Sequence, residues 1–163
     1  MESRFHYLQG APEVRDALLR LSEFVRQCGL EESLRHLIFL RASQINGCAF
    51  CIDMHWKDLR AAGQSEEKLY MLDAWREAPC YTERERAALA WTEAVTLVSH
   101  SHVPDEVYAM ARQQFSETEL ANLTLAISLI NSWNRMNIAF RMPSGSYRAP
   151  SKVRTAASAS TQS

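Results

Sequence analysis

The sequence has few glycines and prolines and no stretch that alternates apolar with polar residues. Five glycines and five prolines are spread over 163 residues, whereas half-buried β-strands normally appear as alternating runs bounded by such turn residues. Apolar residues instead recur at helical spacing along most of the chain. The sequence therefore predicts an all-α protein.

Two further absences narrow the class of protein. Eighteen basic and 19 acidic side chains leave a net charge of −1, so the chain lacks the basic excess that marks most nucleic-acid-binding domains. No apolar run approaches the roughly 20 residues that a membrane-spanning helix needs, and residues 1–16 lack the apolar centre of a signal peptide. We therefore expect a cytoplasmic protein that binds neither nucleic acid nor a membrane.

Capping and breaking residues place the helices that we expect. Six to seven helices follow one another along the chain, and the expected ranges are 12–27, 31–45, 48–62, 65–75, 82–98, 104–115 and 116–142. Thr82 with Glu85, and Ser116 with Glu119, have the spacing of a capping box, in which two side chains satisfy the free N–H groups at a helix start. These two pairs predict where two of the helices begin.

The chain length fits one domain. We expect this domain over residues 1–150 and a flexible polar tail over 151–163. The helix predicted over 116–142 is apolar on more than one side, which is typical of a helix that is central to its domain or shared with a second subunit. A domain of this size has difficulty covering so much apolar surface alone, so we also expect a homo-oligomer.

Three asparagines recur at helical spacing on this last helix. Asn131, Asn134 and Asn137 follow one another at intervals of three residues, which places them near one side of the helix. The spacing leaves two interpretations open. They form a polar seam against backbone or another subunit, or they line an active pocket.

Two of the four cysteines form a CxxC pair within the stretch INGCAFCIDMH, residues 45–55. Asn46-Gly47 is a breaker pair, so we expect a helix to begin at about Cys48. At about 100° per residue, the side chains of Cys48, Cys51 and His55 share one face of that helix. The two cysteines are then close enough for a disulfide, and His55 lies within reach of the Cys51 sulfur.

A helix start favours ionised thiols. Its free N–H groups and the positive end of its dipole stabilise thiolate, which is the form that attacks peroxides and disulfides. His55 can accept the proton that Cys51 releases. A redox dithiol is therefore the first interpretation, zinc ligands are the second, and cysteines that pack as small apolar side chains are the third.

The segment LRASQINGCAFCIDMHWKDLRAAG, residues 40–63, resembles the alkylhydroperoxidase D (AhpD) family within the carboxymuconolactone decarboxylase-like superfamily. YTERERAALAWTEAV and LTLAISLINSWNRMNIAF also resemble short members of this family, so the resemblance covers about residues 10–142. It implies an AhpD-like all-α fold that assembles as a dimer, trimer or hexamer of identical chains. It also implies an antioxidant, thiol-dependent hydroperoxide reductase that needs no cofactor.

The resemblance assigns a role to each residue of the motif. By position, Cys51 matches the peroxidatic cysteine, Cys48 the resolving cysteine, and His55 the histidine that accepts the proton of Cys51. The implied cycle begins when Cys51 attacks a hydroperoxide and becomes a sulfenic acid, and Cys48 then condenses with it to a disulfide. An external thiol reduces that disulfide, and in the best-known relatives the reductant is a lipoyl-bearing protein.

The sequence departs from the family pattern at His36, where the family has a glutamate that completes a proton relay. A histidine can pass a proton, but it supplies no fixed negative charge beside a protonated His55. We therefore expect weaker activation of the thiol. His36 also strengthens the alternative of a zinc-binding or redox-sensing module without turnover, in which Cys48, Cys51 and His55 are the other three ligands.

Overall fold

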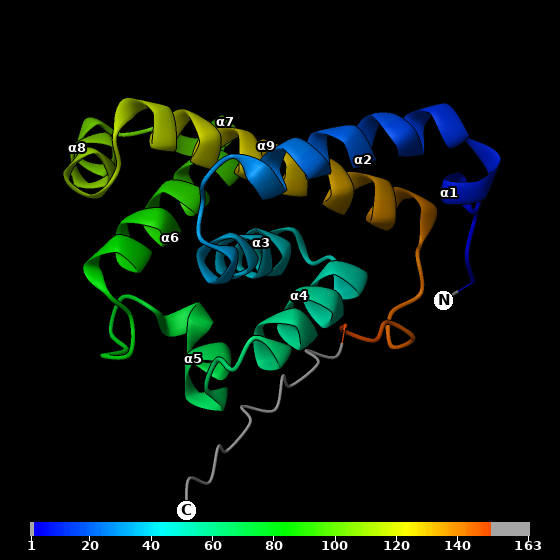
Figure 1. Cartoon of the computed structure of the whole chain (residues 1–163), viewed down its shortest axis with the longest axis horizontal. Helices are drawn as coiled ribbons and strands as arrows, with labels where there is room; N and C mark the ends of the chain where they lie inside the picture. Colours follow the sequence, from blue (N-terminus) through cyan, green and yellow to red (C-terminus); the bar gives the residue numbers. More distant parts are fainter. Residues whose placement is uncertain (1, 151–163) are drawn as a thin grey trace, which may run out of the picture.

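The computed structural model describes residues 2–150, and every regular element in this range is a helix (Figure 1). The elements are α1 (Tyr7–Gly10), α2 (Pro12–Gln27), α3 (Glu32–Asn46), α4 (Ala49–Ala61), α5 (Glu66–Tyr70), the 3-10 helix η1 (Leu72–Ala74), α6 (Glu83–Thr96), α7 (Val98–Ser101), α8 (Asp105–Gln114) and α9 (Glu117–Phe140). The all-α prediction is confirmed. The helix expected over 65–75 is divided into α5 and η1, and the four-residue helices α1 and α7 were not predicted.

Two helices begin where their capping boxes predicted. The Thr82 hydroxyl accepts a hydrogen bond from the Glu85 N–H at 3.2 Å, and the Glu85 carboxylate accepts one from the Thr82 N–H at 2.9 Å. Ser116 and Glu119 form the same reciprocal pair at 3.2 and 2.8 Å. These bonds satisfy N–H groups that no carbonyl within the helix can reach.

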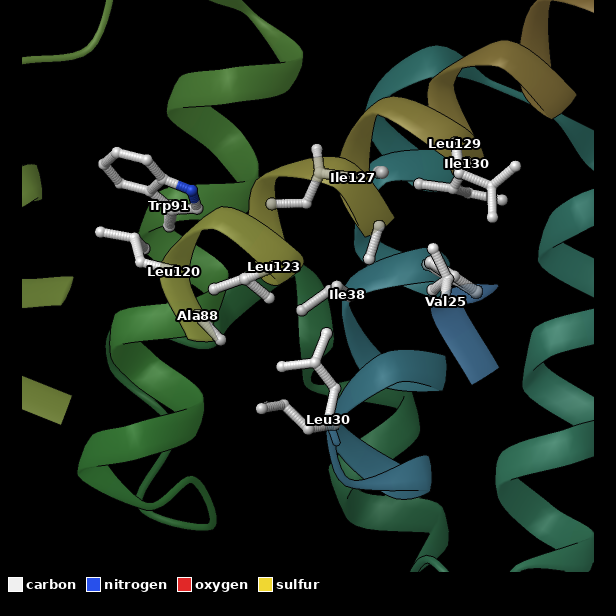
Figure 2. Close-up of a cluster of buried hydrophobic side chains, with 14 of the residues drawn as sticks. Val25, Leu30, Ile38, Ala88, Trp91, Leu120, Leu123, Ile127, Leu129 and Ile130 are labelled. Atoms are coloured by element: carbon white, nitrogen blue, oxygen red, sulfur yellow. The ribbon is translucent and has the colours of Figure 1, made fainter. Parts of the chain in front are cut away.

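Helix α3 lies in the middle of the fold, with α4, α6 and α9 packed around it (Figure 1). The main apolar core forms where α9 crosses α3 and α6 (Figure 2), and α2 packs along α9 (Figure 1). Its largest contributions from α9 are Leu120, Leu123, Ile127, Leu129 and Ile130. A second core joins α3 to α4, α5 and η1 through Leu37, Leu40, Leu59, Leu69 and Leu72. Burial of apolar surface in these two clusters fixes α9 and α4 relative to α3.

Several sequence predictions lie beyond what the fold tests. The predicted tail, 151–163, falls outside the described residues, and the homo-oligomer stays a prediction.

Large apolar side chains remain exposed along α2, among them Leu19 and Phe24. Between residues 2 and 150, no helix is both long enough and apolar enough to cross a bilayer.

Replacing Ile127 by alanine should lower the free energy of unfolding by about 2–5 kcal/mol, because the side chain is fully buried and its loss leaves a cavity. Ile138→Ala is the matched control, since Ile138 lies on the same helix and is 45% exposed. Urea denaturation followed by far-UV circular dichroism, at equal protein concentration, measures both. Equal losses in the two variants would contradict the position of α9 described above.

Candidate functional site

A left-handed glycine makes the turn that starts the site. Gly47 ends α3 with φ of +69°, a conformation that costs glycine little and other residues more. Cys48 follows in extended backbone as the N-cap of α4, and its N–H donates to the Ser43 carbonyl at 3.0 Å. The predicted break is thus confirmed. The helix begins at Ala49, one residue after the predicted start.

The two cysteines lie next to each other in the interior. Cys51 is in the first turn of α4 and is 0% exposed, and Cys48 is 1% exposed. The Cys48 thiol donates a hydrogen bond to the Cys51 sulfur. Asn137 of α9 also donates to that sulfur, with 3.2 Å between Nδ2 and Sγ. The Tyr7 hydroxyl donates to Asn137 Oδ1 at 2.8 Å and so holds the amide in this orientation.

These contacts separate the pKa values of the two thiols. The hydrogen bond from Cys48 is the largest cause that lowers the pKa of Cys51 to about 7, and amide and hydroxyl donors add to it against the opposing effect of burial. The same hydrogen bond, followed by burial, raises the pKa of Cys48. Near neutral pH, Cys51 therefore ionises and Cys48 keeps its proton. Both cysteines lie at the N-terminal end of α4, which favours a thiolate at either position.

The asparagines of α9 form a polar seam, but its partners on the neighbouring helix are side chains of α3 rather than backbone or another subunit, and Asn137 also lines the pocket. Asn46 donates to Asn131 Oδ1 at 3.0 Å and to Asn134 Oδ1 at 2.9 Å, and Asn134 donates to the Ser43 hydroxyl at 3.0 Å. This polar seam joins the end of α3 to α9. Asn137 lies one turn further and reaches the sulfur.

His55 meets His36, as the zinc and relay interpretations both required. The two Nδ1 atoms are 3.3 Å apart, so one can donate to the other when both rings are neutral. Asp58 Oδ2 lies 3.7 Å from His55 Nδ1 and 3.6 Å from His36 Nδ1. The Tyr147 hydroxyl donates to the other Asp58 oxygen at 2.7 Å.

Asp58 supplies a negative charge beside His55, which was not expected from the sequence. It lies three residues after His55 on α4, a spacing that places two side chains together on a helix and that could have revealed it. Tyr147 had no such signal. It comes from the segment after α9, which returns to α4 (Figure 1).

Burial keeps both imidazoles neutral at physiological pH. It is the largest cause that lowers the pKa of His36 to about 4, with the neighbouring His55 as the second cause. Burial also lowers the pKa of His55, although the neighbouring Asp58 carboxylate acts in the opposite direction. The Asp58 pKa is lowered although burial raises it, because His55 lies beside the carboxylate and the Tyr147 hydroxyl donates to it. His55 is thus a neutral base beside a carboxylate, and its buried Nε2 has no hydrogen-bond partner among the described residues.

One group of donor atoms in residues 2–150 lies close enough together to hold a metal ion. It consists of His36, His55 and Asp58, whose donor atoms lie within 4.8 Å of one another. The zinc set predicted from the sequence differs, because Cys48 and Cys51 are not part of this group. The two thiols instead form hydrogen bonds with each other and with the amide groups of α9.

A pocket of about 660 Å³ opens beside these residues, between α2, α3, α4 and α9. Its walls are largely apolar, and His36, His55, Asp58 and Asn137 reach into it. Neither sulfur lines the pocket, since both are buried. A substrate in the pocket therefore reaches Cys51 only if side chains of the pocket wall move.

A model of the carboxymuconolactone decarboxylase family matches residues 12–94, a range that contains both cysteines and both histidines of the site. The chain belongs to this family. The uncharacterized protein YdfG of Bacillus subtilis is 42% identical over 139 residues, which are 85% of this chain and 95% of YdfG. The identity and the coverage show that the resemblance extends well beyond the cysteine motif.

Two further proteins that resemble this chain carry the AhpD name. A crystal structure from Agrobacterium tumefaciens, of a protein of unknown function provisionally assigned to AhpD antioxidant defence, has a TM-score of 0.87. It is 43% identical, and the match covers 90% of this chain and 100% of that one. The alkyl hydroperoxide reductase AhpD of Bradyrhizobium diazoefficiens is 39% identical over 67 residues, which are 40% of this chain and 37% of that protein. The AhpD-like assignment is thus confirmed.

Asn137→Ala should raise the pKa of Cys51 above about 7, because it removes the amide that donates to the thiolate. Thiolate absorbance in the ultraviolet, measured against pH with Cys28 and Cys80 replaced by serine, reports the change. Asn122→Ala is the matched control, since its amide lies on α9 and donates to the Cys28 carbonyl. If the midpoint of the thiolate titration is the same in Asn137→Ala and Asn122→Ala, the Asn137 amide does not stabilise the thiolate.

Proposed function

We propose that this AhpD-like protein is a thiol-dependent hydroperoxide reductase in which Cys51 is the attacking thiolate and Cys48 the resolving thiol. The observation that carries the proposal is the hydrogen-bonded pair itself. Cys51 has a pKa lowered to about 7, while Cys48 lies in contact with it and stays protonated. One nucleophile and one thiol poised to condense with its product are what such a reductase needs.

The reaction transfers two electrons from the cysteine pair to the peroxide. The Cys51 thiolate attacks the terminal oxygen of R–O–O–H, the O–O bond breaks, and the alkoxide takes up a proton and leaves as an alcohol. Cys48 then loses its proton and attacks the sulfenic sulfur of Cys51, which forms the disulfide and releases water. An external dithiol, such as a lipoyl group, returns the two electrons and becomes a disulfide itself.

We infer that His55 moves the proton. It follows Cys51 by one turn on the same helix and is neutral, so it can accept a proton when a thiol ionises and return it to the leaving alkoxide. Asp58 favours the imidazolium that forms, since an opposite charge within about 4–6 Å stabilises a charged group. His36 and Tyr147 orient this pair by their contacts with His55 Nδ1 and Asp58.

A second candidate function is metal binding without turnover. His36 and His55 present Nδ1 atoms 3.3 Å apart, and Asp58 places an oxygen 3.6 and 3.7 Å from them. Neutral imidazoles and a carboxylate are ligands that zinc takes. Such an ion would occupy the atoms that the relay uses, so the two functions exclude each other at this cluster.

Cys51→Ser should abolish the consumption of cumene hydroperoxide with dihydrolipoamide as reductant, because serine cannot form the thiolate. Cys80→Ser is the control, since Cys80 lies near the second core and away from the pocket. The loss of hydroperoxide is followed over time in all three proteins. Equal rates for wild type and Cys51→Ser would refute the peroxidase proposal.

Asp58→Asn should lower kcat/KM for the hydroperoxide at least about tenfold, because the imidazolium loses a charge partner worth roughly one to three pKa units. Asp73→Asn is the control, since Asp73 is exposed and pairs with Arg41 away from the cluster. In wild type, kcat/KM should rise with pH through about 7 as Cys51 ionises. Stoichiometric zinc in protein purified without chelator, lost in Asp58→Asn and kept in Asp73→Asn, would assign the cluster to a metal instead.

A further inference from the structure

Arg35 is a buried cation in the pocket wall that lacks an ion-pair partner. It lies on α3, lines the pocket and is 7% exposed. Within residues 2–150, the hydrogen bond found for its guanidinium joins Nη1 to the Arg26 carbonyl at 3.4 Å, and no ion pair is found. Arginine remains charged in proteins, and a buried charge without a counter-ion is costly. This cost indicates that an anion completes the site.

The other two arginines of the pocket differ from Arg35. Arg15 pairs with Asp16, and Arg26 pairs with Glu23. Glu32 also lines the pocket, three residues before Arg35 on α3, and its charge acts on the guanidinium without forming an ion pair. Arg35 therefore has donors left for a ligand, whereas the charges of Arg15 and Arg26 are already matched.

The remainder of the pocket is suited to an apolar body. Most of its wall consists of aliphatic and aromatic side chains, including Val25, Phe39, Phe50, Met54, Ile130 and Trp133. Its volume of about 660 Å³ lies within the range of roughly 300–1,000 Å³ that holds small ligands. The planar fork of a guanidinium matches a carboxylate with two parallel hydrogen bonds.

Arg35 also lies close to the reacting groups. It directly precedes His36 in α3, and its positive charge contributes to the lowered pKa values of His36 and His55. Asn137, which donates to the Cys51 sulfur, lines the same pocket. A molecule held at Arg35 would therefore extend along a wall that ends beside the thiolate.

We propose that the pocket binds an amphipathic monocarboxylate, with its carboxylate on Arg35 and its hydrocarbon chain against the apolar wall. The substrate is then the hydroperoxide of such an acid, and this second statement rests on the function proposed above. Once side chains of the pocket wall move, the peroxide on the chain meets Cys51, which takes the terminal oxygen and leaves a hydroxy acid. The electrons come from the cysteine pair and are returned by the external dithiol.

Calorimetric titration of the reduced protein with decanoate and with decan-1-ol tests the carboxylate contact without any turnover. Decanoate should bind at least about tenfold more tightly, because hydrogen bonds between charged partners are stronger than those between neutral groups. Arg35→Gln should abolish this preference and keep the affinity for decan-1-ol, which also shows that the pocket still forms. Arg26→Gln is the matched control and should keep the preference, since Arg26 is exposed and paired with Glu23.

Arg35→Lys keeps the positive charge but loses the planar fork of the guanidinium, so it should bind decanoate with intermediate affinity. This variant tests the carboxylate contact if Arg35→Gln does not fold. Equal binding of decanoate and decan-1-ol by wild type would overturn the proposal, as would a preference that survives in Arg35→Gln. If the wild-type protein does not bind decanoate and Arg35→Gln changes the subunit number on size-exclusion chromatography, Arg35 belongs to a subunit interface. This outcome would also overturn the proposal.

The two proposals fail in different ways. If decanoate binds through Arg35 but the hydroperoxide of a fatty acid is not consumed, the peroxidase function is wrong and the carboxylate site stands. If that hydroperoxide and its methyl ester are consumed with equal kcat/KM, the peroxidase function stands and the proposed substrate class is wrong.

Discussion

The contact between α9 and the first turn of α4 is the interaction on which the site depends. Asn137 donates to the Cys51 sulfur across this contact, and Asn134 holds the neighbouring Ser43 hydroxyl. A buried thiolate without such donors would be unstable, because burial alone raises the pKa of a thiol. The apolar residues of α9 hold the helix in the core, so the packing of the domain and the charge state of Cys51 are determined together.

A carboxylate reaches the site from a position that the family resemblance does not imply. The resemblance implies a glutamate at position 36, where this chain has His36, whereas Asp58 of α4 places an oxygen 3.6 Å from His36 Nδ1 and 3.7 Å from His55 Nδ1. Helices α3 and α4 pack along each other, so a side chain from either can reach the space between them. The negative charge beside His55 therefore does not depend on the residue at position 36.

Sequence patterns predicted the features that depend on residues close together in the chain. They missed the contacts that depend on how the helices pack. Capping boxes and the breaker pair located helix starts, whereas the shared face of Cys48, Cys51 and His55 stays a prediction from helical spacing. The same spacing places Asp58 beside His55 on α4. Tyr147 and the partner of Asn137 could not be predicted, because those contacts join segments 86 or more residues apart and depend on how the helices pack.

The site also has an order of assembly that follows from its parts. During synthesis Cys51 emerges 86 residues before Asn137, and Asp58 emerges 89 residues before Tyr147. A nascent chain that carries both cysteines therefore lacks the amide donor and the hydroxyl that complete the site. Both donors reach the site only when α9 and the segment after it have folded onto α4, so Cys51 of the unfinished chain lacks part of the stabilisation that its thiolate has in the folded protein.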